Sequence, residues 1–203
     1  MKAHDKIVKT VLSDVKLAKR FMRFHLPLAL KKGINLETLK VEKGTFVDRK
    51  LREHLSDLLY SVSVKGQESY IYLLLESQST VDPLMAFRLL QYTVQIMQQH
   101  LKSNKNGKRL PLVYPMVYYT GQPSKKGFTR DIIDCFENPK LAKQYFLKPF
   151  KLIDLNTLSD EDLLKDKLLS GLQLIQKHIY ERDLSLILDE MITQDVFVAM
   201  HQF

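Results

Sequence analysis

The sequence predicts an α/β domain in which a β-hairpin is followed by a helix and by a strand buried on both faces. Two β-rich runs, residues 55–64 and 69–75, flank the segment Lys65-Gly66-Gln67-Glu68, which has the composition of a tight hairpin turn. Residues 82–101 carry apolar side chains near helical spacing and begin with Asp82-Pro83, a typical helix start. Residues 110–119 form a continuous apolar run, typical of a strand that a crossover helix covers.

The elements outside this core are mostly helical. Residues 1–30 predict helix, with Ser13 placed to cap a second segment that begins at Asp14. Pro27 and Gly33 interrupt the helical pattern, and residues 38–42 then predict a strand. After the core, residues 151–155 predict one short strand, and residues 159–162 resemble a capped helix start that leads into a mostly helical end.

The bulk composition bounds the class of protein. The chain has 203 residues, of which 45% are hydrophobic and 27% charged, and its net charge is +8. This length suits one domain with a helical appendage, and the positive charge favours a polyanionic partner such as DNA. A single cysteine, Cys135, excludes an internal disulfide. Because the sequence also shows no signal peptide and no apolar run near the roughly 20 residues that span a membrane, we expect a cytoplasmic protein without membrane contact.

The hairpin register decides which acidic side chains meet. If Gly66 and Gln67 are the two loop residues, Asp57 stands opposite Glu76. Strand side chains alternate between faces, so Glu76 and Gln78 lie on the same side of their strand. Two carboxylates would then share one small space, with Cβ atoms about 4.5 to 5.5 Å apart. Such a pair is destabilising unless a cation offsets its charge.

The paired carboxylates predict a divalent metal site. Mg²⁺ prefers oxygen ligands, which Asp57, Glu76 and the Ser77 carbonyl would supply. A bound metal would lower the pKa of a water and stabilise charge on a phosphodiester, while the amide of Gln78 would orient that water. Spacing alone leaves a second interpretation open, in which Asp57 faces solvent and residues 76–80 form a polar turn. A one-residue bulge would turn Asp57 to the opposite face.

The order of these motifs resembles a known nuclease pattern. Asp57 on one strand, a hairpin, and Glu76-Ser77-Gln78 at the end of the next strand resemble the PD-(D/E)XK superfamily. More narrowly, the chain resembles the Rpn family of recombination-promoting nucleases, often labelled transposases. The motifs that carry this resemblance are residues 4–6, 24–27, 56–60, 72–79 and 82–88. This likeness implies a restriction-endonuclease-like core of helix, mixed sheet with a central hairpin, and crossover helix over residues 1–158. It also implies a helical C-terminal extension over residues 159–203.

The resemblance implies a bacterial DNA endonuclease that hydrolyses phosphodiester bonds with Mg²⁺, which Mn²⁺ can replace, and that is linked to recombination or mobile elements. In it, Asp57 and Glu76 would hold the metal, and Gln78 stands where the superfamily usually has Lys. Because this exchange removes a positive charge, a catalytically inactive DNA-binding module with the same fold stays open as an alternative. An assembly protein of a mobile element is a third hypothesis, and a homodimer is a further one.

Other residues have candidate supporting roles. Asp5 is the candidate for an acidic residue on the first helix, with helix capping as the alternative. Arg88, Gln91 and Tyr92 lie on neighbouring turns of the helix after the hairpin, where they would contact phosphate, support Glu76, or only pack or face solvent. Two basic clusters are either solvated loops or DNA-binding residues: Lys102, Lys105, Lys108 and Arg109, and then Lys125, Lys126 and Arg130.

Overall fold

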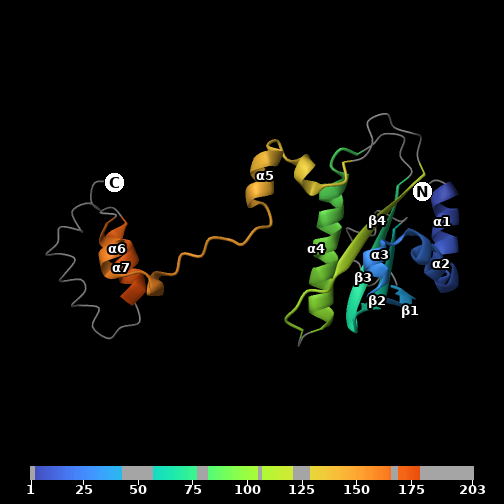
Figure 1. Cartoon of the computed structure of the whole chain (residues 1–203), viewed down its shortest axis with the longest axis horizontal. Helices are drawn as coiled ribbons and strands as arrows, with labels where there is room; N and C mark the ends of the chain where they lie inside the picture. The colour runs from blue at the N-terminus through green and yellow to red at the C-terminus, as the bar shows by residue number, and fades with distance from the viewer. Residues whose placement is uncertain are drawn as a thin grey trace. The chain divides into compact units, whose positions relative to one another are not determined.

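The computed structural model describes residues 3–42, 57–76, 82–104, 107–120, 129–165 and 169–178, with side chains from Lys6 onward. It divides into two compact units, Met1–Phe146 and Leu147–Phe203. The predicted division after residue 158 stays a prediction. The elements of the first unit, labelled in Figure 1 where there is room, are α1 (Ala3–Ser13), α2 (Val15–His25), α3 (Leu28–Lys31), β1 (Ile34–Val41), β2 (Leu58–Val64), β3 (Gln67–Glu76), α4 (Met85–Ser103), β4 (Val113–Tyr119), η1 (Ile132–Cys135) and α5 (Pro139–Tyr145).

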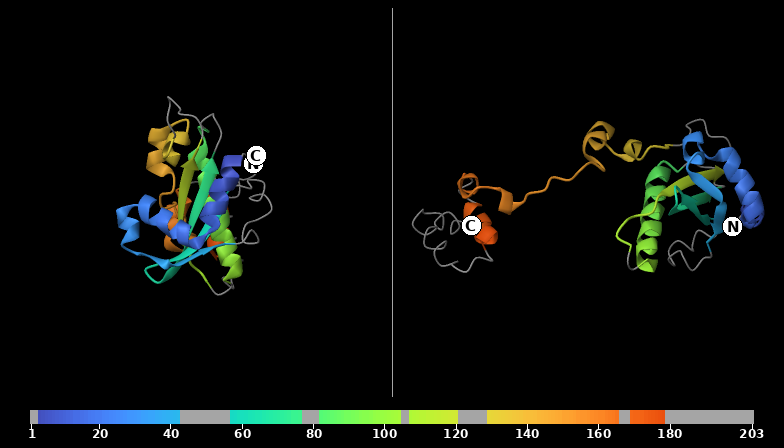
Figure 2. Two further views of the ribbon diagram at one scale, coloured as in Figure 1. Left: turned by 90° about the vertical axis from the view of Figure 1, so that its right-hand side faces the viewer. Right: turned by 60° about the horizontal axis from the view of Figure 1, so that its bottom comes forward.

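A four-stranded mixed sheet forms the centre of the first unit, in the order β1-β2-β3-β4. β1, β2 and β3 pair antiparallel, whereas β4 lies parallel to β3. A parallel neighbour requires a crossover connection, and α4 supplies it. Helices α1 and α2 cover one face of the sheet and α4 covers the other (Figures 1 and 2). The predicted α/β class is confirmed.

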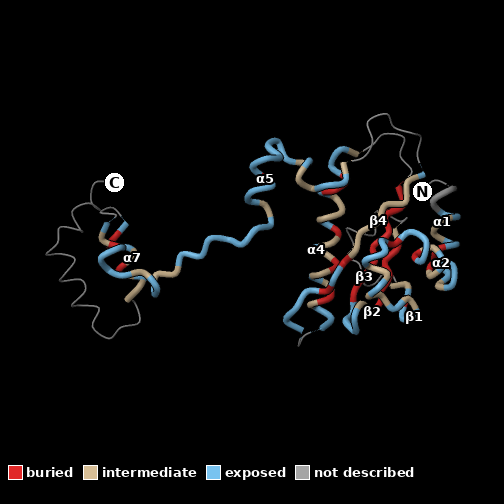
Figure 3. The backbone as a smooth tube through the Cα atoms, viewed as in Figure 1, coloured by how far each residue is buried: buried red, intermediate tan, exposed pale blue. Residues whose placement is uncertain are grey.

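Two apolar layers hold the sheet between its helices. Residues of alternating strand positions pack toward α1 and α2 on one face, around Tyr60, Ile71 and Leu73. The other positions pack toward α4, around Tyr72 and Leu74. β3 is buried from Ser69 to Glu76 because it lies between two strands and between two helical layers (Figure 3). This position explains the apolar run of β3, since each fully buried large apolar side chain contributes roughly 1.5–3 kcal/mol to the stability of the fold.

The turn between β2 and β3 differs from the predicted one. Lys65 and Gly66 are the two loop residues, with φ of 50° and 80°, and Val64 pairs with Gln67. Positive φ at both central positions defines a type I′ turn, whose twist matches that of the strands and which favours Gly at its second position. The predicted register was therefore wrong by two residues. Continuing the observed pairing of Leu58 with Leu73 places Asp57 opposite Leu74 rather than Glu76.

Three further boundaries correct the sequence prediction. Asp14, not Ser13, caps α2, because its Oδ1 accepts from the backbone N–H of Lys16 at 2.8 Å. β1 begins at Ile34, before the predicted residue 38, and ends at Val41. Residues 151–154 form no strand, and Leu155–Thr157 form the short helix η2. A short β-rich run becomes a strand only where a neighbouring strand pairs its backbone, and no pairing partner for residues 151–154 is found in the described part of the chain.

The second unit contains, in its described part, the short helix η2 and two α-helices, α6 (Asp160–Leu164) and α7 (Ser170–His178). Ser159 caps α6 by accepting from the backbone N–H of Asp162 at 3.1 Å, as predicted. Leu163 and Leu174 form the centre of a small apolar cluster. Across the described residues, every helix in either unit is too short or too polar to cross a lipid bilayer.

Candidate active site

Asp57 and Glu76 lie on the same face of the sheet, at the end where β3 stops. Asp57 directly precedes β2 and Glu76 is the last residue of β3. Because strand side chains alternate with period two, the two-residue difference in register leaves both carboxylates on the face that α4 covers. They are offset along the strands instead of directly opposite. Their contacts show what holds each of them.

Arg88 on α4 holds Glu76. Its Nη2 atom donates to Glu76 Oε2 at 3.1 Å, and its Nη1 atom lies 3.6 Å from Asp82 Oδ2. The Glu76 side chain is 7% exposed and that of Arg88 is 21% exposed, so the pair is largely withdrawn from water. A buried charge is costly unless it is paired. Burial lowers the pKa of the Arg88 guanidinium. The neighbouring Glu76 carboxylate and other groups raise this pKa by a larger amount, so its net shift is upward.

Tyr72 holds Asp57. This tyrosine belongs to β3 and is buried, and its hydroxyl donates to Asp57 Oδ2. Burial, and then the negative charge of Asp57, raise the pKa of the Tyr72 phenol well above its ordinary value. The phenol therefore stays protonated across the physiological range. It can act only as a hydrogen-bond donor to a charged carboxylate in that range.

Tyr92 completes this group of side chains. Its ring centroid lies 5.3 Å from that of Tyr72. Burial raises the pKa of the Tyr92 phenol. The positive charge of Arg88 lowers this pKa and the negative charge of Asp57 raises it, and the net shift is upward. Asp57, Tyr72, Glu76, Arg88 and Tyr92 thus influence one another electrostatically, and we refer to them as the carboxylate cluster.

The structure places the other predicted residues in different ways. Arg88 and Tyr92 belong to the carboxylate cluster, whereas Gln91 is exposed on α4, as its solvated alternative requires. Asp5 is part of α1, but its side chain lies outside the described residues. Four other predicted residues lie entirely outside the described residues: Gln78, Lys105, Lys125 and Lys126.

The described part of the first basic cluster lies far from the carboxylates. Lys102, Lys108 and Arg109 are exposed at or after the C-terminal end of α4. At 1.5 Å per residue, Lys102 is about 21 Å along the helix from Arg88. α4 runs antiparallel to β3, so this end of α4 lies beside the β2–β3 turn. Any contact of these residues with DNA would therefore be remote from Glu76.

Sequence reasoning missed two residues that the tertiary structure brings to the site. Tyr72 shares a strand face with Glu76 through simple alternation, and that signal was available. Its hydroxyl contact with Asp57 was not, because it depends on the register of the hairpin. Asp82 was seen only as a helix start, and its Oδ1 does accept from the backbone N–H of Leu84 at 2.8 Å. Its other oxygen also faces Arg88.

The donor atoms of the cluster suit a hard cation. Two carboxylates with oxygen donors lie at one end of the sheet, against an apolar layer. Within the described residues, no group of three His, Cys, Asp or Glu side chains could hold a metal ion. A site built here would therefore take two carboxylates, with backbone or amide oxygens and water for the rest, which is the ligand set typical of Mg²⁺.

The fold and the cluster together define an α/β protein with a four-stranded mixed sheet and several helices, compatible with a nuclease-like core. Its acidic side chains gather where a hairpin strand ends. A family model described as "Putative transposase, YhgA-like" matches residues 2–201. The chain belongs to this family.

The relatives of the chain include both nucleases and proteins named as inactive. It is 39% identical to Recombination-promoting nuclease RpnA of Escherichia coli strain K12 over 188 residues, which are 93% of this chain and 64% of RpnA. It is 35% identical to RpnC of that strain over 94% of this chain and 63% of RpnC. It is 37% identical to Inactive recombination-promoting nuclease-like protein RpnE over 94% of this chain and 63% of RpnE.

These similarities confirm the resemblance to the Rpn family. The chain spans less than two thirds of the length of these three relatives. No solved structure gave a significant match to it.

Proposed function

We propose that this chain carries the nuclease activity of an Rpn-type protein, as an Mg²⁺-dependent DNA endonuclease with a restriction-endonuclease-like core that acts in the cytoplasm. The observation that supports this proposal is the gathering of Asp57 and Glu76 on one face of the sheet, with Glu76 buried and Asp57 half-buried. The names of RpnA and RpnC, which contain recombination-promoting nuclease, support it independently. The link to recombination rests on those names.

In the proposed site, Asp57 and Glu76 hold the metal. When bound, Mg²⁺ lowers the pKa of a coordinated water and stabilises the charge that develops on the phosphodiester. The Tyr72 hydroxyl orients Asp57, and Arg88 orients Glu76. The planar set of donors of the Arg88 guanidinium suits a phosphate oxygen, and Arg88 would be able to contact one if a bound cation took over the charge of Glu76. Gln78 follows Glu76 by two residues and would orient the attacking water.

The second candidate function is a DNA-binding module without catalysis. Gln78 in the place of the usual Lys favours it, because the amide adds no positive charge to polarise the water. The 37% identity to a relative named as inactive also favours it. This module would retain DNA through its net charge of +8, and its binding would weaken steeply as salt concentration rises.

The deciding experiment compares the parent with Asp57→Asn and Glu76→Gln on supercoiled plasmid DNA, with Mg²⁺ and with a chelator. Outer-shell partners of a metal typically contribute 10–100-fold, so loss of a ligand is expected to lower nicking by at least about 100-fold. Glu161→Gln is the matched control, because Glu161 is exposed in the second unit and its variant is expected to nick like the parent. Equal nicking by Asp57→Asn and the parent would refute the site. Salt-dependent DNA binding without metal-dependent nicking would identify the inactive module.

A further inference from the structure

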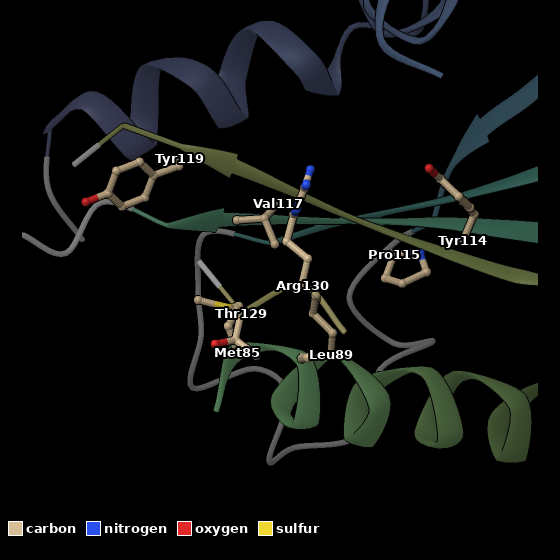
Figure 4. Close-up of a pocket in the computed structure, with 9 residues that line it drawn as sticks. Met85, Leu89, Tyr114, Pro115, Val117, Tyr119, Thr129 and Arg130 are labelled. Atoms are coloured by element: carbon tan, nitrogen blue, oxygen red, sulfur yellow. The ribbon is translucent and has the colours of Figure 1, made fainter. Parts of the chain in front are cut away.

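A pocket of about 430 Å³ opens between α4, β4 and residues 129–130 (Figure 4). Its walls are largely apolar, because Met85, Ala86 and Leu89 of α4 face Pro115 and Val117 of β4. Tyr114 also lines the pocket, although its side chain packs against the cluster on the opposite face of the sheet. The other three lining residues bring polar groups into the pocket. They are Tyr119, Thr129 and Arg130.

This pocket adjoins the carboxylate cluster. Tyr119 is the register partner of Glu76 in the parallel pair of β4 and β3, and the Thr120 N–H donates to the Glu76 carbonyl at 2.9 Å. Partners in register point to the same face, and neighbouring strands are about 4.8 Å apart. Arg88, which pairs with Glu76, directly precedes Leu89 on α4. One end of the pocket is therefore about one strand spacing from the proposed metal ligand.

The lining of the pocket selects a class of ligand. Its volume lies within the range of small-molecule sites, which is roughly 300–1,000 Å³. The apolar walls and the Tyr119 ring suit a flat unsaturated ring, and the Thr129 hydroxyl and the Arg130 guanidinium suit hydrogen-bond acceptors and phosphate. Arg130 is exposed, and no acidic side chain is among the described lining residues. A cationic ligand is disfavoured and a nucleotide fits this chemistry.

We infer that this pocket is a nucleobase subsite, which takes the base next to the phosphate that lies at the proposed metal site of Asp57 and Glu76, while Arg130 contacts the flanking backbone. The inference rests on the proposed function and adds a substrate class to it. In a duplex each base is stacked and paired, with 3.4 Å between successive nucleotides of a strand. A base reaches a side pocket only from a single strand or after it leaves the stack. The preferred substrate is therefore single-stranded or locally unpaired DNA.

Binding without metal tests the subsite directly. The probes are 2′-deoxyadenosine 5′-monophosphate and 2′-deoxyribose 5′-phosphate, which differ only in the base, titrated into the full chain with chelator present. A base that stacks in the pocket is expected to improve affinity by about 10-fold. Equal affinity for the two probes overturns the inference.

Two variants locate the binding. Thr129→Trp fills the pocket from its edge and is expected to weaken nucleotide binding by about 10-fold. Arg130→Ala leaves the apolar walls intact and is expected to weaken the binding of both probes. Arg20→Ala is the matched control, because Arg20 is exposed on α2, across the sheet, and the variant loses the same charge. Should Thr129→Trp fail to fold, Arg130→Ala against Arg20→Ala carries the test, and equal affinities in those two overturn the inference.

A cleavage experiment tests the substrate class. Single-stranded and duplex oligonucleotides of one sequence are compared, and the parent is expected to cut the single strand at least about 10-fold faster, with Thr129→Trp removing most of this preference. Equal rates on the two substrates, or an unchanged preference in Thr129→Trp, overturn the inference. Failure of the nuclease proposal is distinguishable, because the nucleotide-binding experiment contains no metal and requires no cleavage.

Discussion

Replacing Tyr72 by Phe removes one hydroxyl from the carboxylate cluster and leaves the ring in place. The Tyr72 ring is 4% exposed and its hydroxyl donates to the charged Asp57 carboxylate. Tyr60→Phe is the matched control, because Tyr60 is also buried and its hydroxyl donates to the neutral carbonyl oxygen of Leu12 at 2.8 Å. Each variant removes one donor, and the acceptors differ in charge.

The structure sets the expected magnitudes. A hydrogen bond to a charged group contributes roughly 1.5–3 kcal/mol to stability, and one between neutral groups roughly 0.5–1.5 kcal/mol. Asp57 is partly exposed, so water can replace part of the lost bond, and the lower half of the first range applies. We expect Tyr72→Phe to lower the free energy of unfolding by about 2 kcal/mol and Tyr60→Phe by about 1 kcal/mol.

Urea unfolding followed by tyrosine fluorescence measures both changes, since the chain has nine tyrosines and no tryptophan. Asp57→Asn, alone and combined with Tyr72→Phe, closes a double-mutant cycle that isolates the pair. We expect a coupling free energy of about 1 kcal/mol between Tyr72 and Asp57. If the phenol positions a metal ligand, Tyr72→Phe should also slow plasmid nicking by about 10–100-fold.

Two results would refute this reasoning. Equal losses of stability in Tyr72→Phe and Tyr60→Phe would show that the charge of the acceptor does not matter. Additivity of Tyr72→Phe and Asp57→Asn within about 0.3–0.5 kcal/mol would show that the two side chains act independently. In the second case Tyr72 would serve only to fill the apolar layer under α4.

Three further perturbations follow from the structure. Arg88→Met removes the counter-ion of a largely buried Glu76, so we expect the free energy of unfolding in urea to fall by about 2–3 kcal/mol. This is less than the roughly 3–5 kcal/mol that breaking a fully buried pair costs. A loss of stability under about 0.5 kcal/mol would contradict the ion pair. Gly66→Ala places a side chain at φ 80° and should lower the free energy of unfolding by about 1 kcal/mol in the same measurement. Lys65→Asn suits a type I′ turn and should leave the free energy of unfolding unchanged. Burial raises the folded-state pKa of Tyr60, Tyr70 and Tyr72 above the unfolded value near 10, so the stability that these phenols contribute is complete below about pH 10 and is lost as pH rises further. In a titration followed by absorbance near 295 nm, these three tyrosines should ionise only as the chain unfolds. Ionisation of all nine tyrosines with the fold intact would contradict their burial.

Much of the fold could be predicted from local patterns. Alternation and helical spacing located β2, β3 and α4, and a continuous apolar run located β4. Asp82-Pro83 was predicted to start the helix after the hairpin, but α4 begins at Met85. The short run at residues 151–155 was predicted as a strand from its local pattern as well and was wrong. Pairing decides whether such a run becomes a strand, and pairing is not a local property.

The candidate site was predicted in part. Asp57 and Glu76 were expected on one face, and Arg88 and Tyr92 were named as candidate supports, which the carboxylate cluster contains. For the first basic cluster, solvated loop residues and DNA-binding residues were both left open, and its member Lys102 lies about 21 Å along the helix from Arg88. Charge clusters are visible in a sequence, whereas their distance from a site depends on the direction in which the helix returns.

The sequence by itself determined the elements and the face that each side chain occupies, because the period of two in a strand is a property of the backbone. That is why a register prediction wrong by two residues still put Asp57 and Glu76 on the same side. The tertiary structure alone decided which partners they meet: Tyr72 for Asp57, Arg88 for Glu76, and the β4 wall of the neighbouring pocket. Those contacts depend on the dihedral angles of one turn and on the packing of α4 across the sheet, which join residues far apart in the chain.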